Sequence, residues 1–231
     1  MRSFRAAAGL RSCHDAGMPD GVRDWLGEQV RQRVVGPDAP QRHAALFDAS
    51  EPGWFEEDAP IRRVHSDASM FVGGLRALLF QSLHPRAMAG VAQHSDYRSD
   101  PWGRLQRTAD FLAATTFGPA TEAERAVRTV HRVHRRVVGV TRDGEPYAAN
   151  DPHLLRWVHL AELDSFLAAH DRFGEAPLAG AERDGYVDDA AVVARALGVI
   201  EPPTTERELR DQLDSFRPEL RGTPEARDAA R

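Results

Sequence analysis

Hydrophobic residues recur along most of the chain at intervals of three and four, which is the period of an amphipathic α-helix. Helix-start signals punctuate this pattern: a capping residue is followed by proline, or by glutamate three positions later. Together they predict helices over about 22–34, 86–94, 101–117, 121–138, 152–173, 187–197 and 205–216. A turn over 141–146 could form a small hairpin, and strong strand alternation is absent from the sequence. We therefore predict a single all-α domain of about eight helices.

The segment from Ser66 to Phe80 is apolar on nearly every face, so we expect a helix buried on all sides. Gly73 and Gly74 within it predict the close approach of another backbone or of a ligand. We divide the chain into an N-terminal extension with a first helix (1–53) and the main domain (54–231). A helix start at Thr223, close to the last residue, predicts a further element that is interrupted there.

Composition narrows the classes of function. The net charge of −5 argues against nucleic-acid binding. All 30 basic residues are arginine, which excludes lysine Schiff bases and P-loop phosphate binding. Cys13 is the only cysteine, so an internal disulfide, a thiolate zinc site and an iron–sulfur cluster are excluded. The sequence contains no apolar run of membrane-spanning length and no secretory signal, and we expect a soluble, cytoplasmic protein.

Two imidazoles lie in a valine stripe on the helix predicted over 121–138. The stripe consists of Val127, Val130, His131, His134 and Val138. Buried imidazoles need partners, and a metal or a haem iron can supply one while the valines pack against a macrocycle. The alternative is a pair of core or boundary histidines hydrogen-bonded to backbone carbonyls, and the spacing alone favours this alternative.

Two further patterns could carry chemistry. Arg104, Arg107, Thr108 and Phe111 share one face of the helix over 101–117 and could anchor carboxylates, haem propionates or an oxyanion. A solvated arginine face is the ordinary alternative. His84 stands at the break between two apolar helices, where it could line a ligand or cap the preceding helix.

Other motifs are weaker or missing. His159 and Glu162 reverse the Glu-x-x-His order of di-iron bundles, and no second carboxylate-rich helix accompanies them. The sequence has no nucleophile elbow, no glycine-rich phosphate loop and no His-Glu-x-x-His zinc motif.

Four ordered motifs over roughly 55–219 resemble the MpaB-like oxygenases. They lie in FVGGLRALLFQSLHPRAMAGVAQHSDYRSDPWGRLQRTADFLAATTFG, HRVHRRV and DPHLLRWVHLAELDSFLAAHDRF. This family includes the bacterial rubber oxygenases called latex clearing proteins and a fungal oxygenase of mycophenolate biosynthesis. The resemblance implies an all-helical fold that surrounds a buried haem b. It also implies that His134 of the His-x-x-His motif is the proximal iron ligand, with His131 as its companion.

The Arg-x-x-Lys-Thr motif of the latex clearing proteins matches Arg104, Arg107 and Thr108. Their distal lysine is Arg107 here, and a protonated arginine is a poor iron ligand. The sixth iron position is then open, bound by water or served by another residue. Under this resemblance Arg104, Arg107 and Thr108 are the expected catalytic residues. The expected cofactor-binding residues are His131, His134, His84, Val130 and Phe111.

The resemblance implies an oxygenase that uses O2 on a small, apolar, unsaturated organic substrate, with Arg107 or Thr108 donating to the bound oxygen. Two alternatives stay open. One is a haem protein without oxygenase activity, such as a sensor or a peroxidase-like protein. The other is a helical interaction protein without a cofactor.

Overall fold

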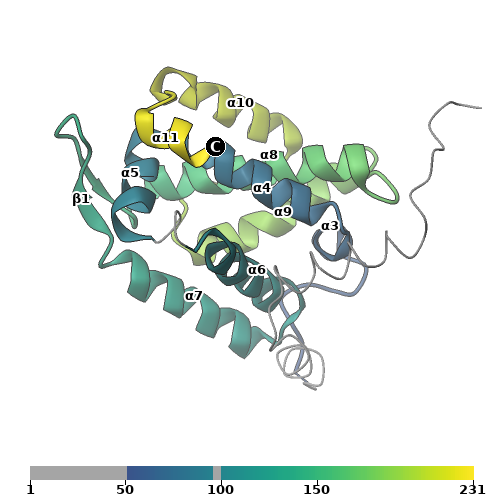
Figure 1. The fold of residues 1–231 in the computed structure, drawn as a ribbon. Helices are drawn as coiled ribbons and strands as arrows, with labels where there is room; N and C mark the ends of the chain where they lie inside the picture. Colours follow the sequence, from purple (N-terminus) through teal and green to yellow (C-terminus); the bar gives the residue numbers. More distant parts are fainter. Residues whose placement is uncertain (1–50, 96–99) are drawn as a thin grey trace, which may run out of the picture.

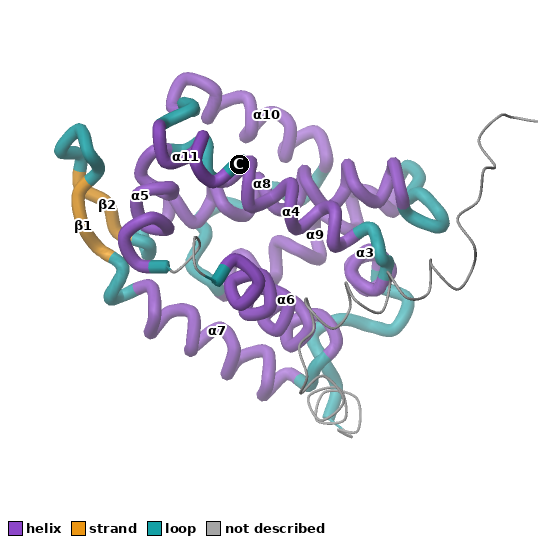
Figure 2. The backbone as a smooth tube through the Cα atoms, in the orientation of Figure 1, coloured by secondary structure: helices purple, strands orange, loops and turns teal. Residues whose placement is uncertain are grey.

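The computed structural model describes residues 51–95 and 100–231, and the helix predicted over 22–34 lies outside this range. Within it, nine α-helices, one 3-10 turn and one hairpin follow each other (Figures 1 and 2). The helices are α3 (Pro60–Ser66), α4 (Met70–Gln81), α5 (Pro85–His94), α6 (Pro101–Phe117), α7 (Ala120–His134), α8 (Pro152–Phe173), α9 (Ala181–Ala196), α10 (Glu206–Phe216) and α11 (Pro224–Ala229). The 3-10 turn η1 spans Arg217–Glu219. The predicted all-α class is confirmed.

Most helix starts follow their sequence signals. The carboxylates of Asp100 and Asp151 accept the backbone N–H groups of Gly103 and His153, and so cap α6 and α8. The Thr205 hydroxyl likewise caps α10. The capping box predicted at Thr121 is wrong, because α7 begins after Pro119 without a side-chain cap.

The end of α7 differs from its prediction. The helix stops at His134, and Val138 instead opens strand β1 (Val138–Val140), which pairs antiparallel with β2 (Pro146–Ala148). Val138 is 54% exposed, so its predicted place in the buried stripe is wrong. The hairpin buries Tyr147 against Ala89 and Leu154. This burial stabilises the hairpin relative to a longer α7.

Two other helices differ from the sequence prediction. The short helix α3 was not predicted, because its surroundings are rich in proline and acidic residues. Helix α9 begins at Ala181 rather than near Val187. The division of the chain at residue 53 remains a prediction.

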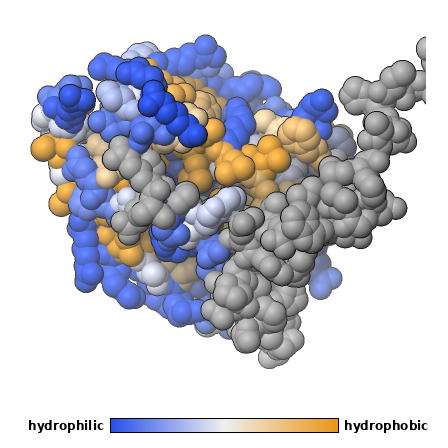
Figure 3. Space-filling model, viewed as in Figure 1, coloured by the Kyte–Doolittle hydropathy of each residue, from blue (hydrophilic) through white to orange (hydrophobic). Residues whose placement is uncertain are grey.

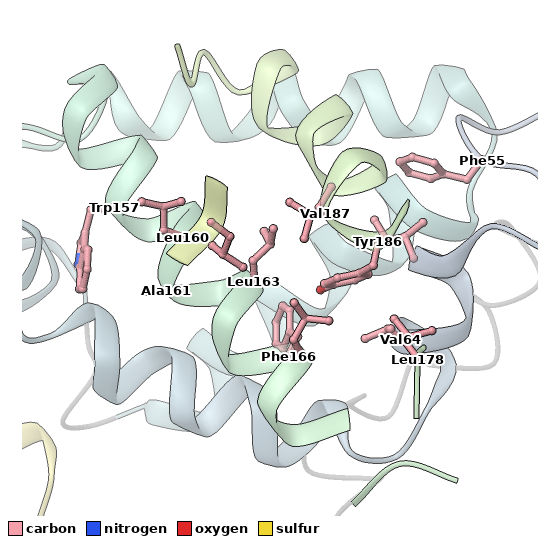
Figure 4. Close-up of a cluster of buried hydrophobic side chains, with 14 of the residues drawn as sticks. Phe55, Val64, Trp157, Leu160, Ala161, Leu163, Phe166, Leu178, Tyr186 and Val187 are labelled. Atoms are coloured by element: carbon pink, nitrogen blue, oxygen red, sulfur yellow. The ribbon is translucent and has the colours of Figure 1, made fainter. Parts of the chain in front are cut away.

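The core forms around α8, the longest of the described helices. Its apolar side chains pack against α9, α3 and the preceding loop (Figure 4). The largest fully buried members are Trp157, Tyr186 and Phe216. Helix α4 lies along α8, and a Cβ added to Gly73 would stand 2.7 Å from Cδ1 of Phe166. The predicted close approach at Gly73 is therefore confirmed.

Helix α4 is not buried on all sides, and that prediction is wrong. Val72, Leu75 and Leu79 are 44%, 51% and 46% exposed, because α8 covers only one side of the helix. With Ala226 and Ala230 they line an apolar groove between α4 and the C-terminal segment. Apolar residues gather at the centre of this face in Figure 3. Among the described residues, no helix is both long and apolar enough to span a membrane.

Candidate functional site

A polar cluster lies where α4, α6 and α8 meet. The amide of Gln81 donates to Oε1 of Glu162 at 3.2 Å. Burial raises the pKa of Glu162 to about 7, although this amide and the charge of Arg104 both act to lower it. Burial also lowers the pKa of Arg104, whose Nη1 donates to Ser95 Oγ at 3.3 Å. The carboxyl of Glu162 is therefore poised to exchange a proton near neutral pH.

Two imidazoles, the buried His159 and the half-buried His65, are held neutral. Burial lowers the pKa of His159, one turn before Glu162 on α8, to about 3. Its Nε2 is buried and has no hydrogen-bond partner among the described residues. Burial also lowers the pKa of His65 to about 3. The ring of His65 is held by Thr116 Oγ1 at 2.8 Å and by the hydroxyl of Tyr186 at 3.4 Å. Of the two rings, His159 is the one with a free nitrogen.

The two histidines of the His-x-x-His motif have different surroundings. Nε2 of His131 donates to the carbonyl oxygen of Ala196 at 3.0 Å, and thereby ties α7 to the end of α9. His131 thus has the carbonyl partner that the spacing alone favoured.

His134 is the last residue of α7 and is half-buried. Burial, together with the nearby His131, lowers its pKa and keeps the imidazole neutral. Within the described part of the chain, neither of its ring nitrogens makes a hydrogen bond. A neutral, unpaired imidazole has a lone pair available for a ligand. On the same helix Val127 is buried and Val130 half-buried.

The arginines of α6 diverge. The side chain of Arg104 donates to Ser95, and its charge acts on Glu162, whereas the side chain of Arg107 is 64% exposed and pairs with Asp100 at 3.7 Å. The hydroxyl of Thr108 donates to the carbonyl oxygen of Arg104 at 3.2 Å, and Phe111 is half-buried. The structure therefore brings Arg104 rather than Arg107 to the polar cluster.

His84 is buried at the start of α5, and its Nε2 lies 3.1 Å from Oε2 of Glu219. The side chain does not cap a helix. Its partner comes from the C-terminal part of the chain, which the sequence analysis did not connect with His84.

Sequence reasoning missed Gln81 and Glu219 and passed over Glu162. A signal for Glu162 existed, since it is a charged residue within a helix that is apolar over most of its surface. Gln81 and Glu219 carry no such signal, because their partners lie 81 and 135 residues away in the sequence.

These features define a helical protein that carries buried and half-buried neutral imidazoles, and a half-buried cluster of an arginine and a carboxyl whose pKa is raised to about 7. Residues 62–231 match the family model described as "ER-bound oxygenase mpaB/B'/Rubber oxygenase, catalytic domain". The chain belongs to this family of oxygenase catalytic domains, which confirms the resemblance seen in the sequence. No significant match was found among curated proteins or among solved structures.

Proposed function

We propose that the protein is a haem b-dependent oxygenase that uses O2 to oxidise a small, apolar, unsaturated organic substrate. Membership of the oxygenase family supports the reaction class. The observation that carries the haem assignment is the state of His134, which is neutral, partly buried and unpaired among the described residues. These are the properties of an imidazole that binds iron.

The residues of α7 fit this role. His134 would hold the iron, and Val130 and Val127 would offer an apolar surface to the macrocycle. When bound, haem supplies an iron centre that activates O2. His131 acts as a positioning residue, because its bond to the Ala196 carbonyl fixes the helix end that carries His134.

The polar cluster supplies proton chemistry. Glu162 can hold a proton at a carboxylate oxygen and release it near pH 7, since its pKa is raised to about 7. The amide of Gln81 orients this carboxylate, and Arg104 supplies a partly desolvated positive charge. We assign the polar contacts of the site to Arg104 and Thr108, and we place Arg107 at its solvent edge as an ion-pair partner of Asp100.

Absorption spectroscopy of the purified protein, with and without added haemin, tests the proposal. The wild type should develop an intense haem band at one haem per chain. The pigment should be extractable with acidified organic solvent, because the sequence lacks a Cys-x-x-Cys-His attachment motif. His134→Ala should lose the band, and the matched control His131→Ala should keep it at reduced occupancy. A wild type that stays colourless would overturn the haem assignment.

Oxygen uptake separates an oxygenase from a haem protein of another kind. The reduced, haem-loaded protein should consume O2 when polyenes or unsaturated fatty acids are added, and the products should carry oxygen from 18O2. The Glu162→Gln variant should bind haem normally and turn over substrate more slowly. Full haem loading without uptake on any unsaturated compound would favour a sensor or peroxidase-like protein.

A further inference from the structure

Three potential metal ligands from distant parts of the chain converge at one end of α8. His84 precedes α5, His153 lies in the first turn of α8, and Glu219 ends η1. One ligand atom from each residue lies within 4.8 Å of the other two. This group shares no residue with the polar cluster around Glu162.

The distances are close to those between ligands of one metal ion. Nε2 of His84 and Nε2 of His153 lie 3.1 Å and 3.0 Å from the same oxygen, Oε2 of Glu219. Two ligands at about 2.1 Å from a metal are about 3.0 Å apart at right angles and about 3.4 Å apart at the tetrahedral angle that Zn²⁺ prefers, so the ligands need to move apart by only a few tenths of an ångström. Each imidazole therefore directs its Nε2 at the carboxylate of Glu219, at a distance close to that between two ligands of one ion.

We propose that His84, His153 and Glu219 bind a first-row divalent transition-metal ion, such as Zn²⁺. Two imidazoles and one carboxylate are ligands that these ions prefer, whereas Mg²⁺ and Ca²⁺ prefer oxygen ligands alone. This site is independent of the proposed haem site, because the two share no ligand.

Access and charge both suit a cation. The side chain of His84 is 2% exposed, but those of His153 and Glu219 are 42% and 36% exposed, which leaves a route from solvent. The guanidinium of Arg86 lies 3.6 Å from Asp151 and 3.7 Å from Glu219. Two carboxylates thus face one guanidinium, and these three groups together carry a net charge of −1.

Aromatic packing fixes the two imidazoles before an ion arrives. The ring of His153 stacks on Phe216 at 4.5 Å, and His84 lies 6.1 Å from Trp157 and 6.2 Å from Phe216 between ring centroids. Nδ1 of His84 is buried without a partner among the described residues. Its only polar contact there is at Nε2, the nitrogen that faces Glu219. Burial also lowers the pKa of His84, and a neutral imidazole is the form that binds a metal.

An ion at this position would fasten the C-terminal segment to the helical core. Next to Glu219, the backbone N–H of Arg221 donates to the carbonyl oxygen of Leu83 at 2.7 Å. The ion would form three bonds, one to Glu219 in this segment and one to each imidazole at the starts of α5 and α8. Because it closes a loop of 135 residues, we expect it to raise the thermal stability of the whole domain.

Cobalt and zinc titrations of the chelator-treated full chain test the proposal. Co²⁺ should bind at one equivalent with a visible d–d spectrum, and Zn²⁺ should displace it and raise the melting temperature. His153→Ala and Glu219→Gln should each weaken Zn²⁺ binding at least tenfold. The matched control His94→Ala removes another exposed imidazole, which contacts the Val138 carbonyl, and should bind Zn²⁺ like the wild type.

Circular dichroism of the metal-free variants shows that they are folded. His153 and Glu219 are both partly exposed, so we expect their helical content to be unchanged. A wild type that binds no Co²⁺ would overturn the proposal, as would tight Zn²⁺ binding that survives in either ligand variant. In that case the three side chains form a hydrogen-bonded cluster only.

Discussion

Replacing Gly73 by alanine should give no gain in stability or a loss, whereas the same replacement at the neighbouring Gly74 should stabilise the protein. A Cβ at position 73 would lie 2.7 Å from Cδ1 and 3.2 Å from Cα of Phe166, and 3.3 Å from Cβ of Ala169. Phe166 is 4% exposed and belongs to the core around α8, so it has little room to move. Among the residues that the structure describes, a Cβ at position 74 would meet only Cδ1 of Leu105, at 3.5 Å, an ordinary contact distance.

The magnitudes follow from two opposing effects. Alanine is favoured over glycine in a helix by about 1 kcal/mol, and this gain applies equally at both positions. Overpacking costs about 1–3 kcal/mol, and it applies only at position 73, where α4 and α8 must separate. Gly74→Ala should therefore gain about 1 kcal/mol in the free energy of unfolding. Gly73→Ala should end about 1–3 kcal/mol below Gly74→Ala, and thus at or below the wild type.

Urea unfolding followed by circular dichroism at 222 nm measures both variants against the wild type. The comparison between them cancels helix propensity and isolates the contact with α8. Equal free energies of unfolding for the two alanine variants would refute the close packing of α4 on α8. A shift of α4 would also move Gln81, which orients Glu162. Haem-loaded Gly73→Ala should therefore oxidise substrate more slowly than Gly74→Ala.

Two further predictions concern charge and capping. The pKa of Glu162 is raised from 4.5 to about 7, so the folded state holds this proton more tightly than the unfolded state. The free energy of unfolding should therefore fall as pH rises from 4.5 to 7. Urea midpoints at pH 5 and pH 7 should show a smaller fall in Glu162→Gln, and an identical fall would contradict the buried position. Thr205→Ala should cost about 1 kcal/mol, because its hydroxyl caps α10, whereas Thr129→Ala on the exposed face of α7 should change stability little. Thermal melts that rank these two threonine variants the other way would refute the cap.

Local signals predicted most of the helices because they act within a few residues. Asp100, Asp151 and Thr205 cap the helices that their spacing indicated, and Pro85 begins α5 as expected. The end of α7 could not be predicted in this way. There the burial of Tyr147 beneath α5 competes with helix propensity, and this contact joins residues far apart in the sequence.

The candidate site was predictable only in part. The periodicity identified the helix of His131 and His134, but it could not tell which imidazole has a partner, because the Ala196 carbonyl comes from another helix. The spacing of Arg104 and Arg107 placed them on one face, yet a three-residue separation still lets one point inward and the other toward Asp100. The approach of Glu219 to His84 depends on tertiary folding alone.

Rescue by imidazole tests most directly whether His134 holds a haem iron. The His134→Gly variant should fold, since the residue lies at a helix end and is half-buried, but it should not develop the haem band with haemin alone. Adding millimolar imidazole should restore the band, because the free ligand can occupy the space that the side chain left. His131→Gly, measured in parallel, should show the band without imidazole and gain nothing from it. A His134→Gly variant that binds haem like the wild type without imidazole would contradict the assignment of His134 as the iron ligand.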